Sequence, residues 1–300
     1  MFYGTILESQ PKITVIEVSD QFYPGVQKTN YGTWPQNSWL SVGLSKSLFN
    51  YVNVEYPRIN FPLNDSIEVC RQRIRQIIND TPGTFILVGH SLGAAAISKV
   101  YKDLKTGDLS SRSRDLLGGF TFGNPERETG HSIPDVDPGG HGVDLYANRL
   151  RQPAALWWDF AIPHDSMTPV TGNDTEVYTS IYNWVATTYT GLFSHMAVQM
   201  GDFGVPEEFS QSFIDTLFGY GGDHRLAPDR PHWDYATYRP IGGDLRSCFQ
   251  IALDRIKQIA QENPPEFTNT VKRESNYEVF SSVGTYTDWI PYEKADCPSN

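Results

Sequence analysis

The chain has 300 residues, of which 39% are hydrophobic and 20% are charged, so it can bury a full core and is not a disordered chain. Its 24 basic residues against 35 acidic residues give a net charge of -11, which repels phosphates and excludes nucleic acid as the main expected partner. The cysteines are too few and too scattered for a disulfide framework or a cysteine-rich zinc site: Cys70, Cys248 and Cys297.

The hydropathy of the chain indicates neither a membrane span nor an export signal. No stretch approaches the roughly 20 apolar residues that a transmembrane helix needs. The first residues, Met1 to Glu8, lack the basic segment and apolar run of a secretory signal. We therefore expect no transmembrane segment and no signal peptide, so another process must release the protein if it acts outside a cell.

The first part of the chain predicts strands and helices in alternation. Ile13–Val18 is β-branched, which is typical of a buried strand. Residues 64–80 place apolar side chains at helical spacing behind the possible N-cap residues Asn64 and Asp65, which predicts an amphipathic helix. The short apolar run Thr84–Gly89 is typical of a strand covered on both faces.

The elements that follow complete one sheet. Residues 91–100 are rich in helix formers and follow the preceding strand with almost no loop, so this turn must be tight. Apolar runs at 117–122 and 154–162 predict two further strands, and 244–260 predicts a last helix. This alternation predicts a doubly wound α/β domain in which helices flank a mostly parallel sheet. Between these elements, residues 123–150 predict a long functional loop.

Two segments stand apart within this single domain of residues 1–300. Residues 174–222 carry aromatic side chains at helical spacing, which predicts an inserted helical cap over the sheet. Its apolar surface suits either long acyl chains or ordinary packing onto the sheet, and both interpretations stay open. Residues 263–300 are polar and predict a C-terminal tail.

The turn between the strand at 84–89 and the helix at 91–100 carries the chemistry. Gly89-His90-Ser91-Leu92-Gly93 matches G-x-S-x-G, in which a strained turn presents a nucleophilic serine and the glycines let strand and helix approach. The match falls between an apolar strand and an alanine-rich helix, as the mechanism requires. It predicts Ser91 as a nucleophile, and a glycine-rich turn with an inert serine is the alternative.

A serine nucleophile needs a base, and the base needs an acid to orient it. On such a fold the order along the chain is serine, acid, histidine, with the acid just past a later strand. Asp165 follows the apolar run that ends at Ile162 and fits this position. Asp159 is the rival, but it lies within the run and is better suited to anchoring the strand.

Of the seven histidines, four adjoin the nucleophile or the acid, or precede the acid, and are set aside: His90, His131, His141 and His164. His195 lies in an apolar helical stretch that is typical of a packing histidine. His224 and His232 share a late polar loop, which suits the base. The alternative for this loop is a poorly specific metal cluster of Asp223, His224, Asp229, His232 and Asp234.

An oxyanion hole is expected from backbone N–H groups. The residue after the nucleophile, Leu92, supplies one of them, and the loop after the first strand supplies the other. In that loop the candidates are Ser19 and Asp20.

Together these motifs resemble the lysin B esterases of phages that infect mycobacteria. Besides the turn around Ser91, Phe122-Gly-Asn-Pro-Glu-Arg127 with Gly130 is similar to the family's Gly-Asn-Pro-x-Arg segment. Asp159 to Asp165 resembles its acid-bearing strand and loop, and Pro231-His-Trp-Asp-Tyr235 resembles its Pro-His-x-x-Tyr segment, which selects His232. Where several members have His-Gly after the first strand, this chain has Ser19-Asp20.

The resemblance implies an α/β-hydrolase of cutinase-like type that cleaves the ester between mycolic acids and arabinogalactan. Ser91, Asp165 and His232 would act through an acyl-enzyme without cofactor or metal, on the mycolyl-arabinogalactan of the host envelope. The protein would be made in the cytoplasm of the infected host and would reach the envelope during lysis. Asn124 and Arg127 would brace their loop or contact sugar hydroxyls.

Two alternatives remain at this stage. One is a general serine esterase, such as a cutinase-like lipase or polyester hydrolase, although such enzymes commonly rely on disulfides and this chain has only three dispersed cysteines. The other is a non-catalytic protein with a hydrolase fold that serves a structural role.

Overall fold

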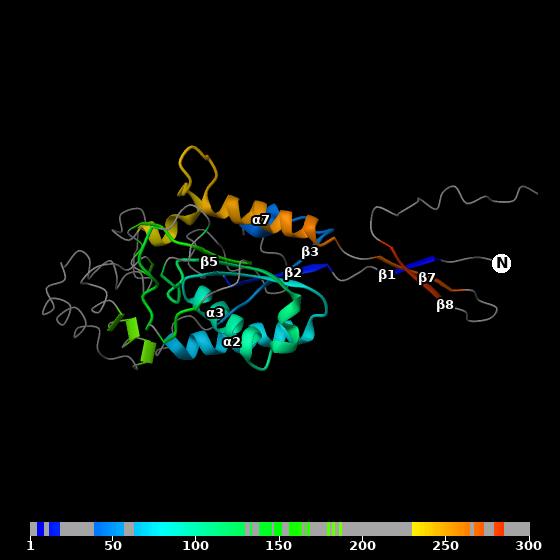
Figure 1. Ribbon diagram of the computed structural model, residues 1–300, viewed down its shortest axis with the longest axis horizontal. Coiled ribbons are helices and arrows are strands. Elements are labelled where there is room, and N and C mark those ends of the chain that lie inside the picture. Colours follow the sequence, from blue (N-terminus) through cyan, green and yellow to red (C-terminus); the bar gives the residue numbers. More distant parts are fainter. Residues whose placement is uncertain are drawn as a thin grey trace, which may run out of the picture.

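The structure is a computed structural model (Figure 1). It describes residues 5–8, 12–18, 39–56, 63–129, 133, 138–151 without Tyr146, 156–168 without His164 and Ser166, 179–180, 182–183, 186–187, 230–264, 267–272 and 279–284.

A five-stranded sheet forms the centre of the chain, in the order β3-β2-β4-β5-β6. Every neighbouring pair in it is parallel. Its strands are β2 (Ile13–Val18), β3 (Phe49–Asn53), β4 (Phe85–His90), β5 (Leu116–Phe122) and β6 (Trp157–Phe160). The parallel sheet predicted from the alternating pattern is confirmed. The chain first adds β3 on one side of β2 and then β4 on the other, so the strand order reverses direction at β2. At such a switch point, a crevice for ligands is expected at the carboxyl ends of the strands.

Helices cover both faces of this sheet (Figure 1). The helices whose bounds the described residues give are α1 (Trp39–Gly43), α2 (Leu63–Asp80), α3 (Leu92–Thr106), the 3₁₀ helices η1 (Ser110–Asp115) and η3 (Arg230–Ala236), and α7 (Cys248–Glu262). In Figure 1, α2 and α3 lie on one side of the sheet and α7 on the other. Parallel strands of this kind are buried on both faces, and all residues of β2 and β4 are buried accordingly.

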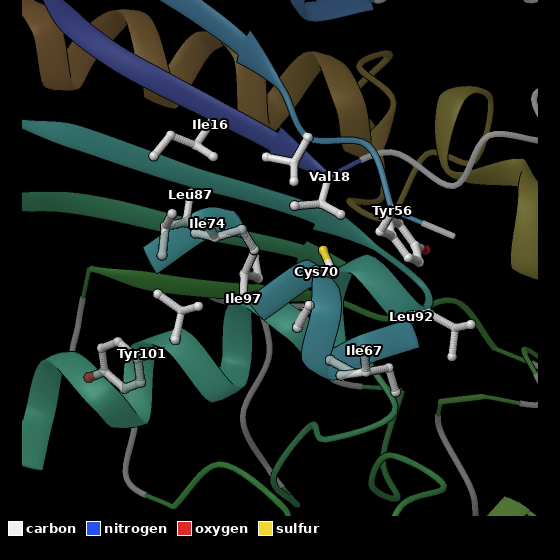
Figure 2. Packing of buried hydrophobic residues seen from close by; sticks show 14 of the residues in the cluster. Ile16, Val18, Tyr56, Ile67, Cys70, Ile74, Leu87, Leu92, Ile97 and Tyr101 are labelled. Carbon is white, nitrogen blue, oxygen red and sulfur yellow. The ribbon is translucent and has the colours of Figure 1, made fainter. Parts of the chain in front are cut away.

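The period of two along the strands divides the core into two apolar clusters. Ile16 and Leu87 belong to the cluster under α2 and α3, whereas their neighbours Val15 and Val88 belong to the cluster under α7. Figure 2 shows the first cluster, in which side chains of α2 and α3 face those of the sheet: Ile67, Cys70, Ile74, Ile97 and Tyr101. Each fully buried aliphatic side chain stabilises the fold by about 1.5–3 kcal/mol.

Helix ends differ from the predictions by a few residues. Helix α2 begins at Leu63, so Asn64 and Asp65 lie in its first turn and are not its N-cap. Helix α7 begins at Cys248, after the predicted start, because Ser247 caps it. The Ser247 side chain accepts the Gln250 N–H and the Gln250 side chain accepts the Ser247 N–H, which is a capping box.

The predicted tail at 263–300 contains two strands, β7 (Phe267–Lys272) and β8 (Val279–Gly284). They form an antiparallel sheet with β1 (Thr5–Glu8), in the order β1-β7-β8. Figure 1 shows this small sheet beyond one end of the five-stranded sheet. The pairing of β7 with β1, at the opposite end of the chain, leaves no local pattern in the sequence. The antiparallel pair of β7 and β8 is local, and the prediction of a tail missed it.

The predicted cap at 174–222 lies mostly outside the described residues. Its described residues, 179–180, 182–183 and 186–187, are helical, and Tyr182 and Ala186 are buried in the cluster under α2 and α3. None of the helices in the described ranges is long and apolar enough to cross a membrane. Cys70 and Cys248 are buried free thiols, and Cys297 lies outside the described residues.

The start of α3 packs against the end of β2 at Gly93. A Cβ atom at this position would lie closer than 3.0 Å to the backbone oxygen and the side chain of Val18. The backbone of β2 cannot move aside without disturbing its pairing with β4, in which Val18 is aligned with Gly89. Glycine at 93 is therefore required by the packing of helix on strand.

We predict that Gly93→Ala destabilises the protein by about 1–3 kcal/mol, the usual cost of overpacking. This cost exceeds the gain of up to about 1 kcal/mol that alanine brings to a helix. The measurement is the thermal unfolding midpoint. Gly242→Ala is the matched control, because no atom lies within 4 Å of its Cβ position. Equal midpoints for the two variants would contradict the predicted contact.

Candidate active site

Ser91 occupies a strained turn between β4 and α3. Its φ is 55° and its ψ is -124°, and among the described residues it is the one non-glycine with positive φ. The Ser91 N–H donates to the Phe122 carbonyl of β5 at 2.9 Å, and the Ser91 carbonyl accepts the Ala95 N–H at 3.1 Å. Such a conformation costs about 1–3 kcal/mol and persists because the strand and the helix on either side determine it.

The glycine before this turn is required by sterics, as the motif predicts. A Cβ atom at Gly89 would lie 2.7 Å from the Gly93 carbonyl oxygen. Leu92 is the first residue of α3, so its N–H belongs to the first turn, where backbone N–H groups have no acceptor within the helix. Ser19 and Asp20, the other candidate oxyanion residues, lie outside the described residues.

Asp165 and His232 are hydrogen-bonded to each other. The His232 Nδ1 lies 2.8 Å from Asp165 Oδ1, and both side chains are 0% exposed. The Met167 N–H also donates to Asp165 Oδ1, at 2.8 Å, which fixes the carboxylate within its own loop. Because a carboxylate oxygen accepts hydrogen bonds, the His232 Nδ1 that bonds to it carries a proton. In the neutral imidazole, Nε2 is then the basic nitrogen.

Tyr235 donates a hydrogen bond to the other oxygen of the same carboxylate. Its hydroxyl lies 2.6 Å from Asp165 Oδ2, and the residue is buried. Both His232 and Tyr235 belong to η3, in which residues three apart lie on one side of the helix. Burial and the charge of Asp165 hold the pKa of Tyr235 well above its usual value, so it stays protonated as a donor. The sequence analysis assigned no role to this tyrosine.

His90 links the turn around Ser91 to η3. Its Nε2 lies 2.9 Å from the His232 carbonyl oxygen, and since a carbonyl only accepts, His90 donates there. The two imidazole rings lie 4.9 Å apart. His90 had been set aside as a base. The structure places it next to His232, and this contact brings the predicted base to the residue that precedes Ser91.

Gly123, directly after β5, lies against the Asp165 and His232 pair. Its φ is +59°, and a Cβ atom there would lie 2.7 Å from His232 Cε1 and 3.2 Å from Asp165 Oδ2. Sequence reasoning did not single out this glycine for the site. The available signals were its place in the segment that resembles Gly-Asn-Pro-x-Arg and its position at the carboxyl end of a strand that neighbours the one before Ser91.

The rival acid, Asp159, has a different set of partners. Its Oδ1 accepts the Asn124 Nδ2 at 2.9 Å and also the hydroxyl of Thr121. Asn124 donates in addition to Ser98 of α3, at 3.1 Å. Asp159 therefore joins β6 to β5, to the loop after it and, through Asn124, to α3, and it is Asp165 that contacts the histidine.

Arg127 is 0% exposed and forms hydrogen bonds with neighbouring loop residues. Its Nε donates to Thr168 at 2.7 Å, and its carbonyl accepts the Gly142 N–H at 2.9 Å. The neighbouring Glu126 forms ion pairs with Lys99 and Lys102 of α3, at 2.9 and 2.7 Å. These contacts suit bracing of the loop, and burial leaves neither Asn124 nor Arg127 on the surface where a sugar would bind.

Several candidates from the sequence lie outside the described residues: His131, His164, His195, His224, Asp223 and Asp229. Three members of the alternative metal cluster are among them. Within the described ranges there is no group of three or more histidine, cysteine, aspartate or glutamate side chains that could hold a metal ion.

Comparison with solved structures defines the fold. The chain is similar to the crystal structure of lysin B from Mycobacteriophage D29, with a TM-score of 0.50 and 19% identity over 83% of this chain and 100% of that one. This protein has the α/β-hydrolase fold. A cutinase-like protein from Cryptococcus sp. matches with a TM-score of 0.36 and 18% identity, over 71% of this chain and 98% of that one.

Comparison of sequences adds one match. The model of a family of unknown function, DUF7297, matches residues 233–300, which contain α7, β7 and β8. No curated protein matches the chain. The residues around Ser91 and Asp165 therefore lie outside the part of the chain that a family model covers.

We predict that Gly123→Ala breaks the hydrogen bond between His232 and Asp165. An added methyl group would displace the imidazole, and the low-field proton NMR signal of the His232 Nδ1–H should disappear. Gly139→Ala is the matched control, because it has a similar positive φ of +83° but no atom within 4 Å of its Cβ position. Both variants carry a backbone strain of about 1–2 kcal/mol. Loss of the signal in both variants, or in neither, would contradict the prediction.

Proposed function

We propose that this protein is a serine esterase with Ser91 as nucleophile, His232 as general base and Asp165 as the acid that orients the base. The observation that carries the proposal is the buried hydrogen bond between Asp165 and His232, 2.8 Å long, beside the strained turn at Ser91. A serine at such a turn, a histidine and a buried carboxylate are the parts that acyl transfer needs.

The reaction proceeds in two halves. His232 Nε2 takes the proton of the Ser91 hydroxyl while Oγ attacks the ester carbonyl carbon, and a tetrahedral intermediate forms. The intermediate collapses, the alcohol leaves with the proton from His232, and the acyl group stays on Ser91. Water then gives a proton to His232 and attacks the acyl-enzyme, which releases the carboxylic acid and restores Ser91.

The developing negative charge on the carbonyl oxygen is met by backbone N–H groups. The N–H of Leu92 is one of them, at the first residue of α3, where the positive end of the helix dipole also favours an anion. The second donor comes from the loop after β2, in which Ser19 and Asp20 are the candidates. No step requires a cofactor or a metal ion.

The proposed substrate is the ester between mycolic acids and arabinogalactan in a bacterial envelope. Support comes from the motifs around Ser91, Asn124, Asp165 and His232 and from a fold similar to that of a phage lysin B. The proposal includes release of the protein from the infected host during lysis. A general esterase acting on other lipids or polyesters is the alternative that the substrate test below separates.

Ser91→Ala should lower the hydrolysis of a p-nitrophenyl fatty-acid ester by at least about 10³-fold, because the acyl-enzyme can no longer form. It should also abolish covalent labelling by a fluorophosphonate, read as the mass shift of the intact protein. Ser98→Ala is the matched control, since Ser98 is a buried serine of α3, the helix that follows Ser91. Full activity of Ser91→Ala, or inertness of the folded wild type, would exclude a serine esterase.

Asp165→Asn should lower kcat by on the order of 10⁴-fold, because the amide no longer holds the tautomer of His232 that is basic at Nε2. Asp159→Asn should keep most of the activity, since Asp159 accepts hydrogen bonds from Thr121 and Asn124. The measurement is steady-state kinetics on the same ester. The reverse ranking of the two variants would assign the acid to Asp159.

The wild type should release free mycolic acids from purified mycolyl-arabinogalactan, and Ser91→Ala should not. Extracted lipids are separated and quantified against a boiled control. Activity on short esters without release of mycolates would support the general esterase instead.

A further inference from the structure

We propose that Tyr235 is a positioning residue for the base: by donating a hydrogen bond to Asp165 Oδ2, it sets both the orientation and the basicity of His232. This inference rests on the proposed function, because it assigns a role to Tyr235 in the same site. Tyr235 would act through Asp165 and would not touch the substrate.

The first argument is the set of bonds around the carboxylate. Asp165 Oδ1 accepts the Met167 N–H and the His232 Nδ1–H, each at 2.8 Å. Asp165 Oδ2 accepts the Tyr235 hydroxyl at 2.6 Å. A buried carboxylate oxygen needs a donor, because an unsatisfied charge away from water is costly. Tyr235 supplies this donor on the side of the carboxylate opposite to the backbone N–H.

The second argument is that Tyr235 cannot turn away from the carboxylate. The residue is 0% exposed. The centroid of its ring lies 5.7 Å from that of Phe122 and 5.8 Å from that of His90. In both pairs the ring planes are nearly perpendicular. Phe122 is itself packed against Phe160 and Phe249, each at 4.8 Å. This aromatic cluster holds the hydroxyl at one position, and through it the carboxylate plane.

The third argument is electrostatic. A hydrogen bond to a carboxylate stabilises its negative charge and weakens the attraction that the carboxylate exerts on a neighbouring imidazolium. Removing the Tyr235 hydroxyl should therefore make His232 more basic. Since His232 must be neutral to accept the Ser91 proton, the acid limb of kcat/KM should move to higher pH.

Two titratable side chains near the pair, Cys248 and Asp159, do not mask this effect. Cys248 of α7 lies near Tyr235, and burial raises the pKa of its thiol to about 12, so it stays neutral. Successive side chains of a strand point to opposite faces of the sheet, so Asp159 of β6 points away from the face that carries Phe160 and Tyr235. The strand end at Phe122 and Gly123 carries no titratable side chain. His90 at the end of β4 also lies beside the pair, and it contacts His232 directly.

The test compares Tyr235→Phe with wild type in the pH dependence of kcat/KM on a soluble ester. In Tyr235→Phe we expect the acid limb of the kcat/KM profile to move up by about 0.5–1 pH unit. Relative to wild type, kcat/KM at pH 6 should then fall by up to about tenfold more than kcat/KM at pH 8. Both pH profiles, with and without Tyr235→Phe, are then repeated in a protein that also carries His90→Gln. This substitution removes the second imidazole and keeps an N–H donor for the His232 carbonyl.

Tyr182→Phe is the matched control. Tyr182 is equally buried, it belongs to the cluster on the other face of the sheet, and its hydroxyl has no hydrogen-bond partner among the described residues. Its pH profile should equal that of wild type. A uniform fall of Tyr235→Phe activity at every pH, or an unchanged acid limb, would overturn the assignment, because a merely structural role gives no shift.

A second readout does not depend on turnover. In the Ser91→Ala background, the imidazole of His232 is titrated by NMR with and without Tyr235→Phe, and we expect the same upward shift. An unchanged titration overturns the inference. Absence of ester hydrolysis and of fluorophosphonate labelling in wild type would overturn the proposed function instead, and the NMR titration would still decide whether Tyr235 controls the basicity of His232.

Discussion

The close approach of three backbone segments around Ser91 is the constraint on which the site depends. The end of β2 meets the first turn of α3 at Gly93, and β4 meets the same turn at Gly89. Side chains at these glycines would separate strand from helix. Because they are absent, Ser91 is held at a positive φ with its N–H bonded to β5, and the position of Ser91 is set by the sheet rather than by a flexible loop.

The second part of the site is a buried polar network that later segments bring to this turn. Asp165 lies in the loop after β6. Its carboxylate accepts hydrogen bonds from its own loop and from two residues of η3. His90 connects that helix to the residue before Ser91. Hydrogen bonds in a buried network polarise one another, so its members are expected to be energetically coupled.

The long loop after β5 is fastened to the same framework. Asn124 reaches both Asp159 of β6 and Ser98 of α3, and Glu126 is buried between two lysines of α3. Burial raises the pKa of Glu126, and the two lysine charges act to lower it. Removing one partner of such a buried ion pair costs more stability than the intact pair contributes, because the other charge is left buried and unpaired. The loop thereby keeps Gly123 against His232.

The sequence by itself determined the parallel sheet and the tight turn at Ser91, because apolar periodicity and glycine sterics act over a few residues. It also predicted an order of serine, acid and histidine for the site. It left Asp159 as a rival to Asp165 and, before the family resemblance, His224 beside His232. Tertiary structure decided which carboxylate meets the histidine and revealed Tyr235, His90 and Gly123 around it. It also paired β1 with β7. These contacts join residues far apart in the chain, and only the folded sheet brings the carboxyl ends of its strands together.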